Sequence, residues 1–527
     1  VKESRQMLGW LTNEIYRRRM MRKGTKKEKK ILAMLRHKTR NQLISNNDVL
    51  KEKELWPEEL QYKKLKLEKT RTRDAKIKNN RMFNEDEAMF YRKIDSSMDK
   101  KGKAPGINKF VEFWAGIWED ETATPDRKWM RTVGEKIRSK VSSVEEFEID
   151  EKMLGDNIKR KKNWSSPGID GIPNFWWKKL KGTWKPLVKS FKKWIDQPES
   201  IPDWVTHGRT VLLPKSEVLD DEKNYRPITC LNTAYKIFTG ILGRYLKEHA
   251  ERNNIWDKSQ LGACSGVLGT VDQLIVDNTI MEEVRERKRN VAVAFYDYEK
   301  AYDMVKHDWM LRVYGWMQVP DKMLNVIREL MRGWKTKLEV VDKSETIVSR
   351  WINIMKGFLQ GDSFSPVGFC ITEVPIGMLL QETDGYMMGP PEERNLKRTH
   401  SLFIDDLKVY QQNHKKLEIA NEMIVKASSD TGACYGVKKC AEIVFMCGKM
   451  EKGDGLKVLE ERMRALDPKQ NEVYKFLGCE QADKTDVDKV MERVKIEMEK
   501  RMEQQVKMNL NDRNLIKAIN CRVVPVA

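Results

Sequence analysis

Two adjacent carboxylates, Asp405 and Asp406, constrain the fold of this chain more than any other feature. They lie between two short apolar runs, residues 399–403 and 407–410, whose composition is typical of β-strands joined by a tight turn. Two like charges at such a turn repel each other unless a cation lies between them. Taken alone, the pair is more typical of a solvent-exposed acidic turn, since Asp is a common turn residue.

A third carboxylate, Asp297, ends the most apolar strand-like segment. Residues 291–296 read Val-Ala-Val-Ala-Phe-Tyr, which predicts a central strand buried on both faces. A core strand that delivers an acid at its tip indicates a functional site rather than packing alone. The acidic turn and this strand therefore predict three carboxylates on adjacent strands.

Two cations, Lys215 and Arg226, lie at the two ends of a predicted hairpin, which is followed by a predicted helix over residues 233–251. Cations that face one gap suit a triphosphate, although ordinary surface cations would give the same pattern. Further along, Gly361 permits close backbone approach, and Pro366 begins a helix predicted to reach residue 380. Gln360 could bond a base or a sugar, or cap the loop.

A basic run at residues 159–162 leads into a turn-rich segment, 165–172, and then into three aromatic residues, 175–177. Such a combination can hold a single nucleic-acid strand by charge and stacking, although aromatic residues after a turn are more often part of a core. The net charge of +20 suits a polyanionic partner. No window of 18 apolar residues occurs, so we expect no transmembrane span and no membrane partner.

The basic run at residues 22–30 could be a nuclear address, a nucleic-acid contact or a solvated helix surface. Residues 1 to about 110 are predicted to be mostly helical, with a break near Trp56 and Pro57. The final portion, from about residue 486, is predicted to form two helices.

In their order along the chain, these segments resemble the motifs of reverse transcriptases. The resemblance is to those of site-specific non-LTR (LINE-type) retrotransposons that carry a restriction-like endonuclease, and it covers roughly residues 155–527. The segments that carry it are 165–172, 214–215 with 225–228, 297–303 (motif A), 360–366 (motif B), 403–406 (motif C), 436–440 (motif D) and 474–478 (motif E, the primer grip).

The resemblance implies a metal site for phosphoryl transfer. Asp297, Asp405 and Asp406, with the carbonyl of Tyr298, would hold two Mg²⁺ ions, and Mn²⁺ is an alternative. Lys439 would protonate the leaving pyrophosphate, although its neighbour Lys438 is a second candidate.

The same resemblance implies a substrate site. Lys215 and Arg226 would bind phosphates, and Tyr302 would be the steric gate whose ring leaves no room for a 2′-hydroxyl. The remaining implied residues are Gln360 and Gly361 in the nucleotide pocket and Phe476, Leu477 and Gly478 in the primer grip.

The chain departs from the family pattern at two places. Motif C usually has an aromatic residue and Ala before its two Asp, whereas this chain has Phe403 and Ile404. The loop after Gln260 has Ala263 and Cys264 in place of Phe-Arg, which puts a template contact in doubt.

The implied fold class is α+β, a right-hand polymerase with a mostly helical basic N-terminal extension. We expect this extension over residues 1–145, fingers over 146–290, a palm over 291–480 and the start of a helical thumb over 481–527. Related elements also carry zinc fingers and an endonuclease, so we expect a part of a longer protein.

The implied function is RNA-directed DNA polymerisation with an RNA template, a DNA primer or target and dNTPs as partners, target-primed and nuclear. Two alternatives stay open: an RNA-dependent RNA polymerase, because Asp297 and Asp303 have a spacing close to that of such enzymes, and a decayed copy that only binds nucleic acid. The sequence does not specify an oligomeric state.

Overall fold

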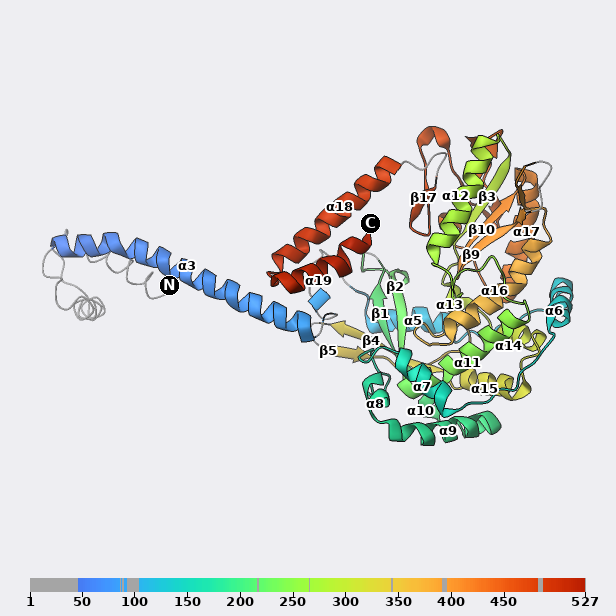
Figure 1. The fold of residues 1–527 in the computed structure, drawn as a ribbon, viewed down its shortest axis with the longest axis horizontal. Coiled ribbons are helices and arrows are strands. Elements are labelled where there is room, and N and C mark those ends of the chain that lie inside the picture. Colours follow the sequence, from blue (N-terminus) through green and yellow to red (C-terminus); the bar gives the residue numbers. More distant parts are fainter. Residues whose placement is uncertain are drawn as a thin grey trace. The chain divides into compact units, whose positions relative to one another are not determined.

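The computed structural model describes residues 46–85, 87, 90–91, 104–215, 218–264, 266–342, 345–390, 396–481 and 487–526. The predicted basic run at 22–30 lies outside these residues. Contacts divide the chain into two compact units, residues 1–99 with 486–527 and residues 100–485 (Figure 1). None of the described helices combines the length and the hydropathy that a membrane crossing requires.

The first unit is helical. It contains α3 (Asn46–Glu85), α18 (Val487–Lys507) and α19 (Asp512–Arg522), and the two helices predicted after residue 486 are confirmed. Its apolar cluster joins Phe83 and Phe90 to Leu510 and Ala518. The predicted break near Trp56 and Pro57 is wrong, because α3 continues through both. The helix is rich in Lys, Glu and Leu, whose high helix propensity opposes the loss of one hydrogen bond at the proline.

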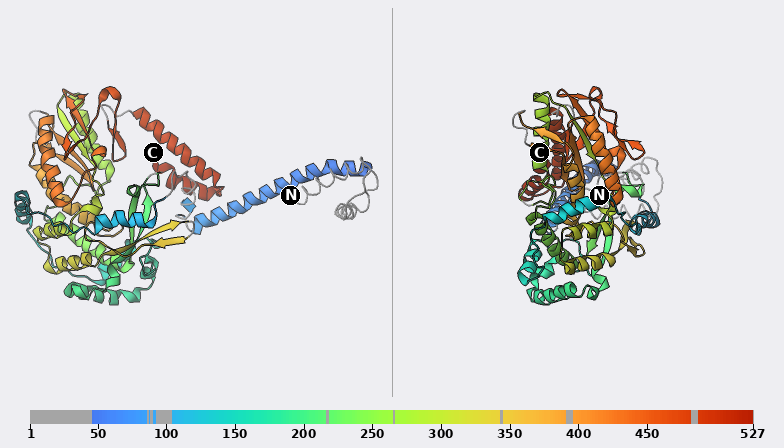
Figure 2. Two further views of the ribbon diagram at one scale, coloured as in Figure 1. Left: turned by 180° about the vertical axis from the view of Figure 1, so that it is seen from behind. Right: turned by 90° about the vertical axis from the view of Figure 1, so that its right-hand side faces the viewer.

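The second unit is built around a six-stranded sheet in the order β12-β11-β3-β10-β9, with β15 paired to β11 (Figures 1 and 2). The central strand is β3 (Val291–Tyr296), and all six of its residues are buried. Its alternate residues Val291, Val293 and Phe295 belong to one core cluster, and the others belong to the cluster on the opposite face. The prediction of a central strand buried on both faces is therefore confirmed.

Helices cover both faces of this sheet. α12 (Thr270–Glu286) shares one core cluster with β3 and β11, and α17 (His414–Thr431) packs on the other face against β3 and β10. α16 (Ser365–Gln381) packs against α17 and against α11 (Thr233–Arg252). The predicted helices that begin at residues 233 and 366 thus form as expected.

A second sheet has the order β2-β1-β4-β5, with β6 paired to β4. β1 (His207–Pro214) and β2 (Tyr225–Leu231) form the predicted antiparallel hairpin. The parallel pairing of β1 with β4 (Lys335–Asp342) was not predicted, because it joins strands that are far apart in sequence and lack a local turn signal.

Residues 104–145 belong to the second unit. α5 (Ile107–Trp118) buries Phe110, Trp114 and Trp118 in its core, and α6 (Lys128–Lys140) buries Met130 and Ile137 there. The boundary predicted at residue 145 is therefore not a boundary between compact units. The many charged residues of this segment made the single apolar face of each helix hard to recognise in the sequence.

Further helices and strands complete the second unit. The helices are α7 (Glu151–Arg160), α8 (Asn174–Lys179), α9 (Trp184–Asp196), α10 (Asp203–Thr206), α13 (Ala301–Met304), α14 (His307–Trp316) and α15 (Asp321–Arg332). The strands are β5 (Glu345–Val348), β6 (Ile352–Asn353), β7 (Tyr386–Met388), β8 (Leu396–Arg398), β9 (His400–Phe403), β10 (Asp406–Gln411), β11 (Ala441–Met446), β12 (Lys449–Glu451), β13 (Lys457–Val458), β14 (Glu461–Arg462), β15 (Arg464–Ala465), β16 (Tyr474–Phe476) and β17 (Cys479–Gln481).

Candidate active site

A pocket of about 480 Å³ lies where β3 ends, beside the β9–β10 turn and the β1–β2 hairpin. It gathers most of the residues that the sequence singled out. The predicted residues that line it are Lys215, Arg226, Asp297, Tyr298, Tyr302, Gln360, Gly361, Asp405 and Lys439. Asp406 and the hairpin residues Phe476, Leu477 and Gly478 do not line it.

The three carboxylates meet because of the strand register. Leu407 pairs with Tyr296, so the preceding residue of β10, Asp406, and the residue after β3, Asp297, reach the same end of the sheet. Burial and then the charge of Asp405 raise the pKa of Asp406 to about 6. Burial also raises the pKa of Asp405, and Asp297 adds to that shift. The site therefore holds negative charges that lack full compensation.

Lys439 contacts the first of these acids. Its Nζ lies 3.0 Å from Oδ1 of Asp297, and the amide of Gly436 donates to the Asp297 carbonyl oxygen at 2.8 Å. Of the two candidate lysines, Lys439 lines the pocket and Lys438 does not.

Asp297, Asp405 and Asp406 are candidate ligands for a divalent cation. In the described part of the chain, no group of three or more His, Cys, Asp or Glu side chains is arranged as a ready ligand set, and Lys439 occupies one oxygen of Asp297. The carboxyl groups of Asp405 and Asp406 nevertheless have pKa values raised by burial and by repulsion from neighbouring acids. A hard cation such as Mg²⁺ relieves that repulsion, so the donor chemistry fits.

Part of the pocket wall is cationic. Burial and the charges of Lys300, Arg226 and Lys439 lower the pKa of Lys215, so these three cations lie close enough to repel Lys215. Lys300 was not predicted, because a single Lys beside motif A carries no distinctive signal. It has a left-handed backbone (φ 52°), and its Nζ lies 4.8 Å from the ring centre of Phe113. A polyanion would relieve this repulsion.

Tyr302 is held by aromatic packing. Its ring stacks on Phe369 with centroids 4.8 Å apart and an interplanar angle of 13°, and it meets Phe358 edge-on. Burial raises the pKa of its hydroxyl, so the group stays neutral. The ring is therefore fixed in one orientation on the wall of the pocket.

Gln360 and Gly361 form the adjoining part of the wall. The Gln360 side chain donates to Oδ2 of Asp303 at 3.0 Å, and Trp118 donates to the other oxygen at 3.0 Å. Burial raises the pKa of Asp303 to about 6. Gly361 has φ 120°, and a Cβ atom there would lie 2.4 Å from the carbonyl oxygen of Thr229. Only glycine permits this approach.

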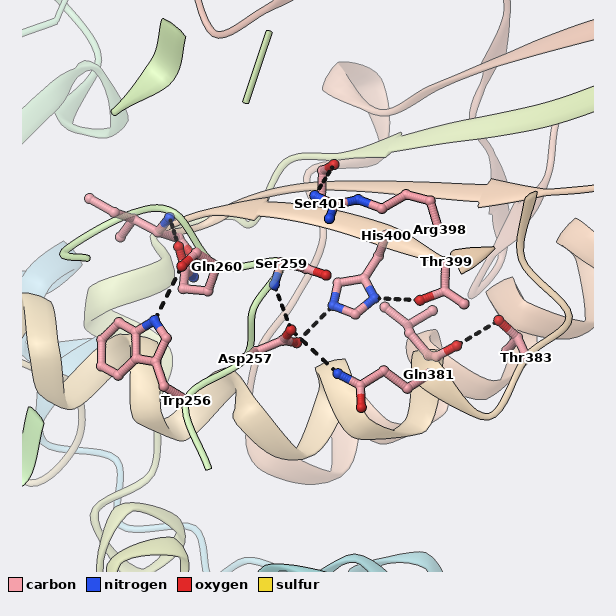
Figure 3. A network of polar contacts seen from close by, with 12 residues as sticks. Trp256, Asp257, Ser259, Gln260, Gln381, Thr383, Arg398, Thr399, His400 and Ser401 are labelled. Carbon is pink, nitrogen blue, oxygen red and sulfur yellow. Dashed lines mark hydrogen bonds and ion pairs between the residues drawn. The ribbon is translucent and has the colours of Figure 1, made fainter. Parts of the chain in front are cut away.

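The turn that carries Asp405 is strained. Ile404 has φ 60°, a conformation that is rare for a β-branched residue and costs on the order of 1–3 kcal/mol. Gln260, which is 2% exposed, accepts from the Ile404 amide at 2.8 Å and donates to its carbonyl at 3.0 Å. The Gly262 amide also donates to Gln260, at 2.9 Å. Gln260, which lies beside Trp256 in Figure 3, therefore holds the turn in place.

We expect Gln260→Leu to lower the free energy of unfolding by about 2–3 kcal/mol, since each of three lost hydrogen bonds contributes about 1 kcal/mol. Urea denaturation of the two proteins measures this difference. Gln273→Leu is the matched control: Gln273 is fully buried, and neither of its amide atoms has a partner among the described residues. Equal losses in the two variants would contradict the role given to Gln260.

The predicted primer-grip hairpin forms, with its turn at Leu477 and Gly478, which both have positive φ. Its Phe476 is buried against the sheet, with its ring 5.7 Å from that of Phe295.

A buried polar network, which the sequence did not reveal, connects this hairpin to β10. Lys408 is hydrogen-bonded to Asp277 and to Gln481 of the hairpin, and Tyr410 donates to Asp277 at 2.7 Å.

Comparisons with known proteins point to one family. Residues 213–481 match the family model described as reverse transcriptase (RNA-dependent DNA polymerase). The chain is 26% identical over 289 residues to the retrovirus-related Pol polyprotein from type-1 retrotransposable element R2 of Nasonia vitripennis, which is 55% of this chain and 26% of that protein. The corresponding polyprotein of Popillia japonica is 27% identical over 243 residues, 46% of this chain and 33% of that protein.

A third relative is the retrovirus-related Pol polyprotein from type-2 retrotransposable element R2DM of Drosophila melanogaster. It is 23% identical over 280 residues, which is 52% of this chain and 24% of that protein. The chain therefore spans about a quarter to a third of the length of these relatives.

Proposed function

The chain belongs to the reverse transcriptase family, and we propose that it extends a DNA primer on an RNA template. The reaction transfers a nucleotidyl group from a dNTP to the primer 3′-hydroxyl and releases pyrophosphate. One observation carries the proposal: Asp297 and Asp405 share a pocket with Tyr302 and a wall of cations. The carboxylates can hold metal cations, the basic side chains can bind a triphosphate, and the Tyr302 ring can lie beside the sugar.

Each group has a defined task. Asp297 and Asp405, with the Tyr298 carbonyl and the neighbouring Asp406, would hold two divalent cations, Mg²⁺ or alternatively Mn²⁺. When bound, such ions lower the pKa of the attacking hydroxyl and neutralise the leaving pyrophosphate. Lys439 then leaves Asp297 and can donate a proton to the leaving group.

The cationic wall orients the triphosphate. Lys215 directly follows β1 and Arg226 lies on β2, the two paired strands of one hairpin, so a single element presents both side chains. We add Lys300 to this set, because it lines the same pocket. Gln360 and Gly361 close the pocket beside them, and Phe476, Leu477 and Gly478 support the primer strand.

Tyr302 selects deoxynucleotides by excluding a 2′-hydroxyl. Tyr302→Val should reduce the preference for dNTPs over rNTPs by roughly 10–100-fold, which corresponds to about 1–3 kcal/mol for a steric contact of this kind. Steady-state incorporation of dCTP and CTP opposite a template G measures it. Phe358→Leu, which alters a ring that packs on Tyr302, should change the preference far less, and an unchanged preference in Tyr302→Val would remove Tyr302 from this role.

We infer the polymerase architecture from the resemblance to the family. The sheet of β3, β10 and β11 would be the palm within residues 291–480, and the β1–β2 hairpin would belong to the fingers within 146–290. Residues 481–527 would begin the thumb. We extend the polymerising unit toward the N-terminus to include α5, because Trp118 supports Asp303 in the pocket.

The relatives are polyproteins of R2 retrotransposable elements, and we infer that this chain also serves a non-LTR element. In that setting the primer is a nicked chromosomal target, the template is the RNA of the element, and the site of action is the nucleus.

Primer extension on an RNA template, with dNTPs and rNTPs in separate reactions, tests the proposal. We expect divalent-cation-dependent extension with dNTPs. Extension with rNTPs alone would favour an RNA-dependent RNA polymerase. The feature that supports this alternative is Asp303, whose two carboxylate oxygens already accept hydrogen bonds from Trp118 and Gln360. RNA binding without any extension would favour a decayed copy.

A further inference from the structure

A second hollow, of about 350 Å³, lies at the end of β9 remote from the strained turn. Its rim carries four cations, Lys140, Lys258, Lys397 and Arg398, from α6, the loop after α11 and strand β8. The proposed polymerase chemistry uses none of them.

The floor of the hollow is a fixed polar network (Figure 3). Asp257 Oδ2 lies 2.8 Å from Nε2 of His400, and Oδ1 accepts from the Ser259 amide at 2.8 Å and from Gln381 at 3.4 Å. Asp257 is 4% exposed, and His400 is fully buried. A Cβ atom on Gly377 would lie 1.9 Å from Asp257 Oδ2, so the glycine in α16 makes room for the carboxylate.

The cations of the rim are not neutralised by this floor. Lys140 donates to the carbonyl of Asn254 at 3.1 Å, and Lys397 donates to the carbonyls of Gln381 and Thr383 at 2.8 and 3.1 Å. Arg398 donates to the Ser401 hydroxyl, and its Nε atom has no partner among the described residues.

No ion pair within 4.0 Å joins any of the four cations to a carboxylate in the described part of the chain. The one acid that lines the hollow, Asp257, faces His400. Burial lowers the pKa of Lys140, the charge of Asp257 opposes this shift, and the charge of Lys258 adds to it. The hollow therefore carries four cations against the single carboxylate of Asp257.

We propose that this hollow binds phosphate groups of a nucleic-acid backbone, specifically of the RNA, at a site separate from the active site. Three ammonium groups and one guanidinium provide donors suited to phosphate oxygens. A volume of about 350 Å³ accommodates a phosphodiester unit. The choice of RNA as the partner rests on the proposed function. The inference that the hollow binds phosphate rests only on its four cations.

The site lies next to the support of the catalytic turn. Asp257 and Gln260 belong to one short loop, and they hold the two ends of β9 through His400 and Ile404. Phosphate bound here would therefore fix RNA to the same rigid element that carries the catalytic turn.

The RNA-binding test uses the full chain carrying Asp405→Asn, because this variant should bind RNA without extending a primer. A fluorescein-labelled RNA hairpin is titrated at several KCl concentrations, and fluorescence anisotropy gives the affinity. We expect Lys140→Gln/Lys258→Gln/Lys397→Gln to weaken binding on the order of 10–100-fold. The slope of log affinity against log salt should fall by about 2–3, since each phosphate contact contributes about 0.9.

The control variant is Lys189→Gln/Lys192→Gln/Lys193→Gln on α9, which removes the same charge from exposed positions of the same unit. Its salt slope should change by less than about 1. Equal slopes in the two triple variants would overturn the proposal, because the effect would then be one of net charge.

A second arm distinguishes the source of the phosphate. Isothermal titration with sodium tripolyphosphate counts the sites for a free anion on the same proteins, and the proposed active site supplies one of them. Loss of one tripolyphosphate site in Lys140→Gln/Lys258→Gln/Lys397→Gln together with weaker RNA binding supports the proposal. Loss of that site with unchanged RNA affinity overturns it in favour of a small-anion site. Because none of these measurements needs polymerisation, they stand whether or not primer extension succeeds.

Discussion

Asp405→Asn should reduce dNTP incorporation on an RNA template by roughly 1000-fold or more. The amide keeps the size of the side chain but removes the charge that a divalent cation requires, and such a loss corresponds to about 4 kcal/mol of barrier height. Asp405 lines the pocket beside Asp297, so no other described side chain replaces it at the tip of the turn. Single-nucleotide primer extension under rapid mixing measures the rate.

The same variant should not be less stable than the wild type. Burial and Asp297 raise the folded-state pKa of Asp405, so the folded state binds a proton there more tightly than the unfolded chain does. At pH 7, which is above the unfolded pKa, deprotonation of Asp405 therefore favours the unfolded chain, and Asn removes this effect. A Tm equal to or above that of the wild type, together with lost activity, separates a catalytic role from a structural one.

Asp384→Asn is the matched control for Asp405→Asn. Asp384 pairs with Lys416, 3.1 Å away, and its side chain is 58% exposed, so the change should leave both activity and stability within about 1 kcal/mol. Normal primer extension by Asp405→Asn would show that the metal ligands have been misassigned.

Lys408→Met should lower the free energy of unfolding by about 3–5 kcal/mol, because it leaves the buried charge of Asp277 without an opposite charge. Both side chains are fully buried. The Nζ atom of Lys408 also lies 4.6 Å from the ring centre of Phe295 and 5.3 Å from that of Phe476. Urea denaturation followed by tryptophan fluorescence measures the loss.

The double variant Lys408→Met/Asp277→Asn sharpens this test. Removing both charges should restore much of the lost stability, since replacing a whole buried ion pair is far less damaging than breaking it. Lys416→Met, which breaks the exposed pair with Asp384, should cost less than about 1 kcal/mol. A double variant as unstable as the sum of its parts would argue against a direct Lys408–Asp277 coupling.

This network also links two motifs that the sequence presented separately. Lys408 lies two residues after Asp406, and its partner Gln481 ends the hairpin that contains Phe476. We therefore expect amide protons of β16 and β17 to exchange with deuterium faster in Lys408→Met than in the wild type, because the hairpin loses its anchor to β10.

The sequence by itself determined the parts of the site that depend on local pattern. An uncharged run ending in Asp297 specifies a buried central strand, and Gly361 specifies a close backbone approach. Asp405 and Asp406 between two short strands specify a hairpin tip. In each case the signal lies within a few residues, where period and turn chemistry govern the backbone.

Only the tertiary structure decided how these parts are supported. Trp118 bonds to Asp303 across 185 positions of sequence, and Gln260 bonds to Ile404 across 144. The assignment of residues 1–145 to a separate extension failed for the same reason, since α5 buries its apolar face on a partner far along the chain. Polar and apolar contacts of this kind depend on which surfaces the fold brings together, and no local pattern encodes that choice.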